Sequence, residues 1–428
     1  MHREILRIAI PSIVTNITVP LLGMVDLSIA GHIGSASVIG AISVGGLIFN
    51  MVYWLFNFLR MGTSGLTAQA FGRGDAEGQR RVLRLALTIA LVCGVAIFSI
   101  QRPIEWMAHF IVAPTDQVWQ LAIAYFRVRI WAAPAVLALF ALNGWFVGMQ
   151  NSRFPMYISI GQNLLNIGLS ALLVFHFHLG IEGVALGTVC SQYAGLLAAL
   201  LLVPHTRLSN IGQGDKDARQ VKSFKVYSHI FLRMIFLIAV TTAFTSFGAR
   251  QGDMLLAVNT LLIQLFILFS YFCDGFALAG EALVGKYVGA QAPEQQRRCI
   301  IRLFQWAGGV TLLFTLLYAA VGDYILQILT SDEAVVAASA PYFYWILLVP
   351  ISGFAAFMWD GIFIGATATR QMLYTLAVAA TLFFIVWYLP LPLSTNHHLW
   401  LSFVLYLATR SIYQTFLAKR TLDNHERH

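Results

Sequence analysis

The sequence predicts an all-α membrane protein with twelve transmembrane helices in two six-helix bundles. Two observations lead to this prediction. The 428-residue chain is 58% hydrophobic and 11% charged, whereas soluble domains carry about 25% charged residues. A soluble fold of this composition would have more apolar surface than it can bury. In addition, one pattern of glycine, phenylalanine and arginine occurs twice in the chain, 217 positions apart.

The repeated pattern is read from two segments, 143–153 and 360–370. The matching pairs are Gly144 and Gly361, Phe146 and Phe363, Gly148 and Gly365, and Arg153 and Arg370. The same shift relates Gly72, Glu77, Gln79, Arg80 and Arg81 to Gly289, Glu294, Gln296, Arg297 and Arg298. A chain this apolar that consists of a duplicated half is typical of a membrane transporter.

Twelve stretches are long and apolar enough to cross the hydrocarbon layer, which takes about 20 residues. They are 5–30, 36–61, 84–105, 118–142, 154–177, 181–204, 227–249, 254–284, 300–322, 335–365, 371–390 and 398–418. The first is expected to be a retained helix, since no small-residue cleavage site follows a short apolar stretch as in a signal peptide.

The predicted domains are an N-lobe (1–204), a polar cytoplasmic linker (205–226) and a C-lobe (227–428). Because six spans is an even number, both lobes enter the membrane in the same orientation. They are therefore expected to be related by a pseudo-two-fold axis along the membrane normal, as in transporters with parallel repeats.

Lysine and arginine gather on one side of the predicted spans, which places both termini in the cytoplasm. This side includes Arg3, Arg7, Arg73, Arg80, Arg81, Arg84, Arg153, the 207–225 segment, Lys286, Arg297, Arg298, Arg302, Arg370, Lys419, Arg420 and Arg427. Arg102 and Arg250 are expected on the opposite side. This asymmetry accounts for the net charge of +8. No basic patch with interleaved aromatic residues occurs, so no nucleic-acid partner is expected.

Four carboxylates fall inside or beside predicted spans, namely Asp26, Asp274, Glu281 and Asp360. A charge in the hydrocarbon layer is costly, so each is a functional candidate. Asp26 is the strongest of these candidates, because Pro11 and Pro20 interrupt its helix and proline can make a hinge. The alternative is a carboxylate held permanently by hydrogen bonds.

Neutral polar residues could surround such a carboxylate. Asn163, Asn166 and Ser170 share one face of the fifth span, Thr188 lies in the sixth, and Asn143 ends the fourth. The alternative is that these groups only join helices by hydrogen bonds.

In the second half, Asp274 and Glu281 are seven residues apart and share a helix face. Two carboxylates in one site of low dielectric constant cannot both ionise cheaply, so one should hold a proton or face a cation. A static hydrogen bond to a neighbouring helix is the alternative. No metal-ligand spacing, nucleophile elbow or phosphate-binding loop occurs, so no catalytic residue, metal or cofactor is expected, and an integral-membrane enzyme is disfavoured.

Four segments in this order resemble the multidrug and toxic compound extrusion (MATE) family, and closely its DinF branch. They are Met24–Gly31, Gln69–Asp75, Asp274–Gly285 and Asp360–Thr367. The resemblance implies cation-driven export of hydrophobic, often cationic compounds, with Asp26 as the titrating carboxylate and Asn143, Asn166, Ser170 and Thr188 as its network. Many members carry Asp where this chain has Ser170, which weakens an Na⁺ site and favours H⁺.

The functional hypothesis is therefore a multidrug efflux antiporter that works by alternating access. Protonation of Asp26 and bending of the first helix at Pro11 or Pro20 would release the drug. Coupling through Asp274, Glu281 and Asp360 is the competing mechanism. Small-molecule drugs and H⁺, with Na⁺ as the alternative ion, are the expected partners of a monomer in the bacterial inner membrane. The nearest rival is a flippase of lipid-linked oligosaccharides.

Overall fold

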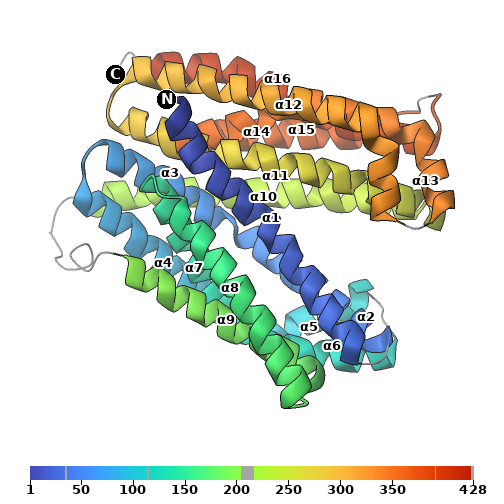
Figure 1. The fold of residues 1–428 in the computed structure, drawn as a ribbon. Coiled ribbons are helices and arrows are strands. Elements are labelled where there is room, and N and C mark those ends of the chain that lie inside the picture. Colours follow the sequence, from blue (N-terminus) through green and yellow to red (C-terminus); the bar gives the residue numbers. More distant parts are fainter. Residues whose placement is uncertain (34–35, 113–114, 204–215, 331, 391, 426–428) are drawn as a thin grey trace. The chain divides into compact units, whose positions relative to one another are not determined.

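The computed structural model describes all residues except 34–35, 113–114, 204–215, 331, 391 and 426–428, and shows helices without strands in the described part (Figure 1). In the first half they are α1 (His2–Ile33), α2 (Ala36–Phe56), α3 (Phe58–Gly72), α4 (Ala76–Ser99), α5 (Gln101–Val112), α6 (Asp116–Arg129), η1 (Ile130–Ala132), α7 (Ala133–Gly148), α8 (Arg153–Ala171), η2 (Leu172–His176) and α9 (Gly180–Leu202). In the second half they are α10 (Lys216–Ala249), α11 (Asp253–Gly289), α12 (Pro293–Leu329), α13 (Glu333–Ser339), η4 (Ala340–Tyr342), α14 (Phe343–Gly365), α15 (Thr369–Tyr388) and α16 (Thr395–His425).

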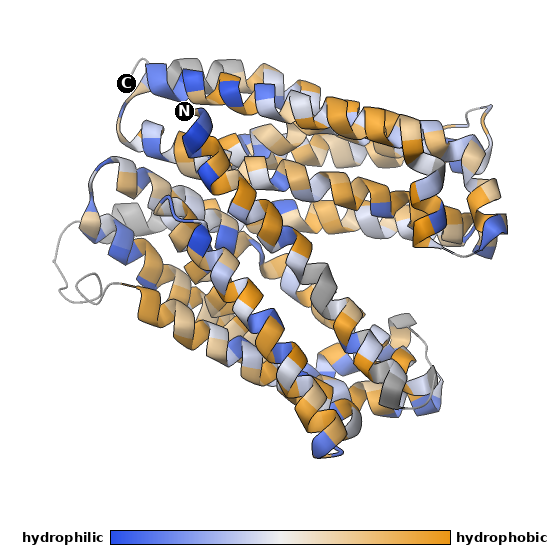
Figure 2. Ribbon diagram, in the orientation of Figure 1, coloured by the Kyte–Doolittle hydropathy of each residue, from blue (hydrophilic) through white to orange (hydrophobic). Residues whose placement is uncertain are grey.

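The all-α membrane fold is confirmed. Among the described residues, 11 helical segments are long and apolar enough to cross a membrane. The twelfth predicted span, 398–418, lies inside α16. Long hydrophobic stretches run along the helices, with hydrophilic residues near many helix ends (Figure 2). Several helices extend beyond the ends of the predicted spans. Only Asn57 separates α2 from α3, so that helical stretch continues to Gly72 instead of ending at residue 61.

The chain divides into two compact units. The N-terminal unit comprises residues 10–223, and the C-terminal unit comprises residues 224–428 together with residues 1–9. Residues 1–9 thus pack with the second half of the chain, although the expected N-lobe of 1–204 includes them. Glu4 lies 3.8 Å from the Lys286 ammonium, and the Trp306 indole donates to His2 at 3.1 Å. Residues 205–215 of the predicted linker lie outside the described residues, and from Lys216 the chain is already helical.

One close helix crossing occurs in both units. In the N-terminal unit, a Cβ on Gly144 of α7 would lie 2.3 Å from the Arg60 carbonyl oxygen of α3, and one on Gly148 would lie 2.6 Å from that of Ser64. In the C-terminal unit, a Cβ on Gly361 of α14 would lie 2.2 Å from the Ala277 carbonyl oxygen of α11, and one on Gly365 would lie 2.7 Å from that of Glu281. Each contact recurs 217 residues later, so the duplication read from the glycines is also a duplication of packing.

The turns repeat as well. Gln150 (φ 65°) and Thr367 (φ 54°) end the glycine-bearing helices, and Gly74 (φ 68°) and Gln291 (φ 53°) precede α4 and α12. Non-glycine residues rarely adopt positive φ, so two such residues at equivalent positions reflect a shared turn. Asp75 then caps α4, because its carboxylate accepts from the Gly78 amide at 2.7 Å.

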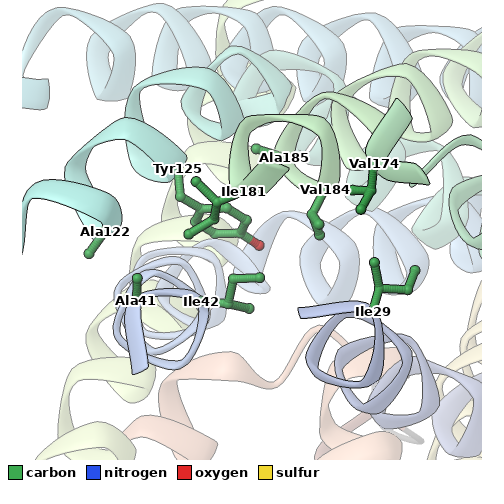
Figure 3. Packing of buried hydrophobic residues seen from close by; sticks show 9 residues of the cluster. All are labelled: Ile29, Ala41, Ile42, Ala122, Tyr125, Val174, Ile181, Val184 and Ala185. Carbon is green, nitrogen blue, oxygen red and sulfur yellow. The ribbon is translucent and has the colours of Figure 1, made fainter. Parts of the chain in front are cut away.

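A hydrophobic cluster closes one end of the N-terminal unit, where α1, α2, α6, η2 and α9 meet (Figure 3). Its buried members are Ile29, Ala41, Ile42, Ala122, Tyr125, Val174, Ile181, Val184 and Ala185. Apolar burial of this kind stabilises by about 25 cal/mol per Å². Asp26 on α1 and Thr188 on α9, described next, each lie three residues from a member of this cluster, Ile29 and Ala185.

Candidate ion-coupling site

Asp26 is buried in the N-terminal unit, with 2% of its surface exposed. With the Asn166 amide nitrogen facing the carboxylate, Asn166 donates to Asp26 Oδ1 at 3.2 Å. The amide oxygen then accepts from Thr188 Oγ1 at 3.0 Å and from the Thr188 backbone N–H at 3.2 Å. Three of the sequence-predicted residues therefore meet, from α1, α8 and α9.

The opposite orientation of the same amide is also compatible with hydrogen bonding. In it, Asn166 Nδ2 donates to Thr188 Oγ1 at 3.0 Å, and the amide oxygen faces Asp26. The Thr188 hydroxyl reaches the Val184 carbonyl at 3.1 Å, so its single proton can go either there or to Asn166. The two amide orientations match an ionised and a protonated Asp26, since only the protonated carboxyl can donate to an amide oxygen.

Ser170 lies one turn beyond Asn166, is fully buried and donates to the Val184 carbonyl at 3.5 Å. A Cβ added to Gly187 would lie 2.4 Å from Ser170 Oγ. Helices α8 and α9 thus touch at this point, and the small side chain at position 170 fits the close approach.

A polar seam joins α1 to α8 ahead of Asp26. Asn163 donates to the Thr18 carbonyl at 2.9 Å, and the hydroxyls of Thr18 and Ser159 are 3.3 Å apart. The fifth-span face predicted from the sequence is therefore directed at α1.

The hinge residues do not break α1, which is helical from His2 to Ile33. Pro11 is buried, and the Thr15 hydroxyl donates to its carbonyl at 2.9 Å. The side chain of Pro20 lies outside the described residues. The prolines therefore mark where α1 lacks backbone hydrogen bonds, while its path remains helical in this conformation.

Asn143 is not joined to this cluster. It lies on α7 one residue before Gly144, and its buried Oδ1 has no hydrogen-bond partner among the described residues. Its neighbour Gly144 is in contact with α3. The family resemblance implies that Asn143 belongs to the network of Asp26, and this role stays a prediction.

Arg129 was missed at the sequence level. It ends α6 inside the predicted span 118–142, donates to the Tyr125 hydroxyl and lies over the rings of Phe49 (5.2 Å) and Tyr125 (5.4 Å). Its charge also acts on Asp26. The signal was available, because an arginine inside an apolar span is as unusual as a carboxylate. Its neighbour Arg127 was also overlooked, and it pairs with Glu105 at 2.9 Å.

Asp360 belongs to a separate cluster in the C-terminal unit. It forms an ion pair with Arg233 of α10 and another with Arg410 of α16, the latter at 2.7 Å, and it accepts from Gln414 at 2.8 Å. Asp274 and Glu281 lie on α11 and make no ion pair or hydrogen bond with Asp360. Glu281 is 2% exposed and Asp274 is partly buried. Among the described residues, no group of three or more His, Cys, Asp or Glu is placed to hold a metal ion.

Comparison with known proteins decides the family. The MatE family model matches residues 11–172 and 230–389, one stretch in each half of the chain. The chain belongs to the MATE family. The matched stretches contain Asp26, Asn166, Asp274 and Asp360, and they confirm the resemblance drawn from the short segments.

Several MATE relatives align over most of both chains. DNA damage-inducible protein F of Escherichia coli is 36% identical over 411 residues, 95% of this chain and 89% of the relative. Protein DETOXIFICATION 44, chloroplastic, of Arabidopsis thaliana is 25% identical over 96% of this chain and 80% of the relative. The probable multidrug resistance protein NorM of Photorhabdus laumondii is 21% identical over 87% of this chain and 83% of the relative.

Solved MATE structures share the fold. One in a bent conformation superposes with a TM-score of 0.85 at 19% identity, covering 100% of this chain and 96% of the other. One in a straight conformation gives 0.84 at 18% identity, covering 99% and 97%. The protein is therefore a multi-pass membrane protein of a transporter family.

Proposed function

We propose that this MATE protein is a proton-coupled antiporter that exports hydrophobic, often cationic compounds across the bacterial inner membrane. The observation that carries the proposal is the buried cluster of Asp26, Asn166 and Thr188 in the N-terminal unit. The relative named as a probable multidrug resistance protein supports the substrate class, and the E. coli relative supports a bacterial membrane.

The proton acts at the Asp26 carboxylate. While ionised, Asp26 only accepts hydrogen bonds, and Asn166 presents its amide nitrogen to it. Once protonated, Asp26 also becomes a donor, the Asn166 amide turns its oxygen toward Asp26, and the nitrogen takes the Thr188 hydroxyl. Proton binding at α1 is thereby transmitted to α8 and α9.

Movement of α1 follows from the same contacts. The α1 helix is held to α8 through Thr18 and Asp26, and both contacts lie beyond Pro11. Loss of the charge at Asp26 weakens one of them, and a helix with prolines bends at lower cost than an unbroken one. Bending would change the shape of the N-terminal unit and release the bound compound.

H⁺ is favoured over Na⁺ because of the groups around Asp26. Na⁺ is a hard cation that prefers several oxygen ligands, carboxylates among them. Position 170 supplies a hydroxyl that already donates to Val184, and Asn166 offers its nitrogen to the ionised carboxylate. No second carboxylate supports an ion here among the described residues of the cluster.

The proposal is tested by efflux driven by a pH gradient in proteoliposomes that contain the purified protein and a fluorescent cationic dye. Asp26→Asn is compared with wild type and with Asp75→Asn. The control makes the same chemical change at a helix cap outside the spans, where asparagine caps about as well as aspartate.

We expect wild type and Asp75→Asn to export the dye when a pH gradient is present, with or without Na⁺, and Asp26→Asn to lose this activity. Undiminished export by Asp26→Asn would move coupling to Asp274, Glu281 or Asp360. Export that requires Na⁺ would contradict the proton proposal. Absence of export by folded wild type would contradict the substrate class.

A further inference from the structure

Two buried arginines in the C-terminal unit share a single carboxylate, that of Asp360. Asp360 pairs with both Arg233 and Arg410, and the exposed side-chain fractions are 10%, 4% and 6%. Arginine stays protonated in proteins, so two guanidinium groups and one carboxylate leave a net charge of +1 in this cluster.

The hydrogen-bonding capacity of this cluster is not used up. The Nε atoms of Arg233 and Arg410 and the Oε1 atom of Gln414 are buried without a hydrogen-bond partner among the described residues. An unpaired buried donor on a charged group is costly. Guanidinium donors are also the groups that best match a carboxylate, because they bind it through two parallel hydrogen bonds.

Among the described residues, Asp360 is the carboxylate that forms ion pairs with these two arginines. Asp274 and Glu281 are not paired with either arginine, and the groups that act on Arg410 are Asp360 and Tyr406. The Tyr406 hydroxyl accepts from Arg410 at 3.4 Å, and its ring lies 5.4 Å from the guanidinium carbon. The phenol orients Arg410 and leaves its charge in place.

The repeat shows that this charge is not needed to build a lobe. At a shift of 217 residues, Arg233, Asp360, Arg410 and Gln414 correspond to Asn16, Asn143, Tyr193 and Leu197, all of them uncharged. The N-terminal unit makes the same helix crossing without an ion pair at these positions. A purely structural link to Asp360 would also need only one arginine.

We propose that Arg233 and Arg410 form a binding subsite for the carboxylate of an amphipathic organic compound. The substrates would then include zwitterions and organic anions in addition to cations, with the anionic group held in the C-terminal unit. Asp360 occupies the arginines in the absence of ligand and competes with the incoming carboxylate. As a statement about transported compounds, the inference rests on the proposed function, but carboxylate binding can be measured without transport.

The test compares two probes that differ only at one carboxyl group, rhodamine B and its ethyl ester. Fluorescence polarisation measures their binding to the full-length protein in nanodiscs. The variants are Arg233→Gln and Arg410→Gln, each of which leaves Asp360 one arginine partner. Arg298→Gln is the matched control, since Arg298 and its partner Glu294 are 73% and 78% exposed on the same unit.

We expect each buried variant to bind rhodamine B about tenfold more weakly, the factor that one charge-assisted hydrogen bond supplies. The ester should bind about as well as to wild type, and Arg298→Gln should leave both probes unchanged. An equal loss for both probes, or no loss for either, would overturn the subsite. Failure of the proposed antiport would instead appear as absent dye export with carboxylate-selective binding intact.

Asp360→Asn gives a second measurement with the opposite sign. It removes the internal competitor and raises the net charge of the cluster from +1 to +2, so rhodamine B should bind several-fold more tightly and the ester should not. Weaker binding of rhodamine B to folded Asp360→Asn would mean that Asp360 and the arginines serve only to join α10, α14 and α16. This second variant also decides the case if an arginine variant does not fold.

Discussion

At the scale of single residues, the N-terminal cluster shows what a sequence can and cannot indicate. Asp26, Asn166 and Thr188 could be chosen because polar groups in an apolar span are rare, and helical spacing places Asn166 and Ser170 on one face. Which polar groups meet across helices depends on the rotation of each helix. Arg129 was therefore missed, and the role of Asn143 stays a prediction because the contacts of its Oδ1 do not show one.

Thr188 is expected to orient the Asn166 amide in both protonation states of Asp26. Thr188→Val keeps the shape of the side chain and removes the hydroxyl. We expect it to destabilise the protein by about 1 kcal/mol, the usual value of an interhelical hydrogen bond in a membrane. Dye export should also slow. The unfolding midpoint and the export rate measure the two effects.

Thr188→Ser is the control for this prediction, because it retains the hydroxyl and loses a methyl group. Its export rate should remain closer to wild type than that of Thr188→Val. The opposite order, with the serine variant slower, would show that the methyl packing of Thr188 matters and that its hydrogen bonds to Asn166 and Val184 do not.

At the scale of helices, the repeated glycines explain how α7 meets α3 and α14 meets α11. A glycine allows two backbones to approach within a distance that any Cβ would prevent, which is a common way for membrane helices to associate. The sequence indicated the repeat but not its reason. The partner carbonyls, on Arg60 and Ala277, lie in segments whose side chains differ between the two halves.

Gly361→Ala should therefore destabilise the C-terminal unit by about 1–3 kcal/mol, the usual cost of overpacking. Its Cβ would lie 2.2 Å from the Ala277 carbonyl oxygen, which cannot move without shifting α11. The unfolding midpoint in detergent measures the effect. Gly309→Ala, on α12 with no atom within 4 Å of the added Cβ, is the control and should not lower the midpoint. Equal midpoints for the two variants would contradict a tight crossing.

At the scale of the whole molecule, the two halves of the duplication differ in where their charged groups lie. The crossings and turns are shared, but the charged groups are not. Asp26 corresponds to Ala243, whereas Asn143 corresponds to Asp360. The N-terminal unit therefore keeps a carboxylate that contacts a neutral amide and feels the charge of Arg129, and the C-terminal unit keeps one paired with two arginines. Conserved backbone geometry thus carries two different electrostatic environments.

Much of this architecture could be predicted from the sequence, because long apolar stretches and a 217-residue repeat are properties of the chain itself. The predicted helix ends were less accurate, since helices such as α10 and α12 extend beyond the apolar stretch into polar segments. The membership of residues 1–9 in the C-terminal unit could not be predicted. It depends on contacts of Glu4 and His2 with residues almost 300 positions away.

The orientation of the whole molecule in the membrane gives a last prediction. Lysine and arginine on short loops stay in the cytoplasm. Arg153 and Arg370 begin α8 and α15, whereas Asp116 and Asp253 begin α6 and α11 at the opposite ends of their spans. Alkaline phosphatase, which is active only outside the cytoplasm, should be active when fused after residue 115 or 178 and inactive when fused after residue 151 or 428.

Green fluorescent protein, which fluoresces only when folded in the cytoplasm, serves as the reciprocal control at the same four positions. It should be bright after residues 151 and 428 and dark after residues 115 and 178. The reverse pattern in both reporters would show that the protein has the opposite orientation in the membrane. The proton would then reach Asp26 from the opposite side, so the direction of export proposed here requires the first pattern.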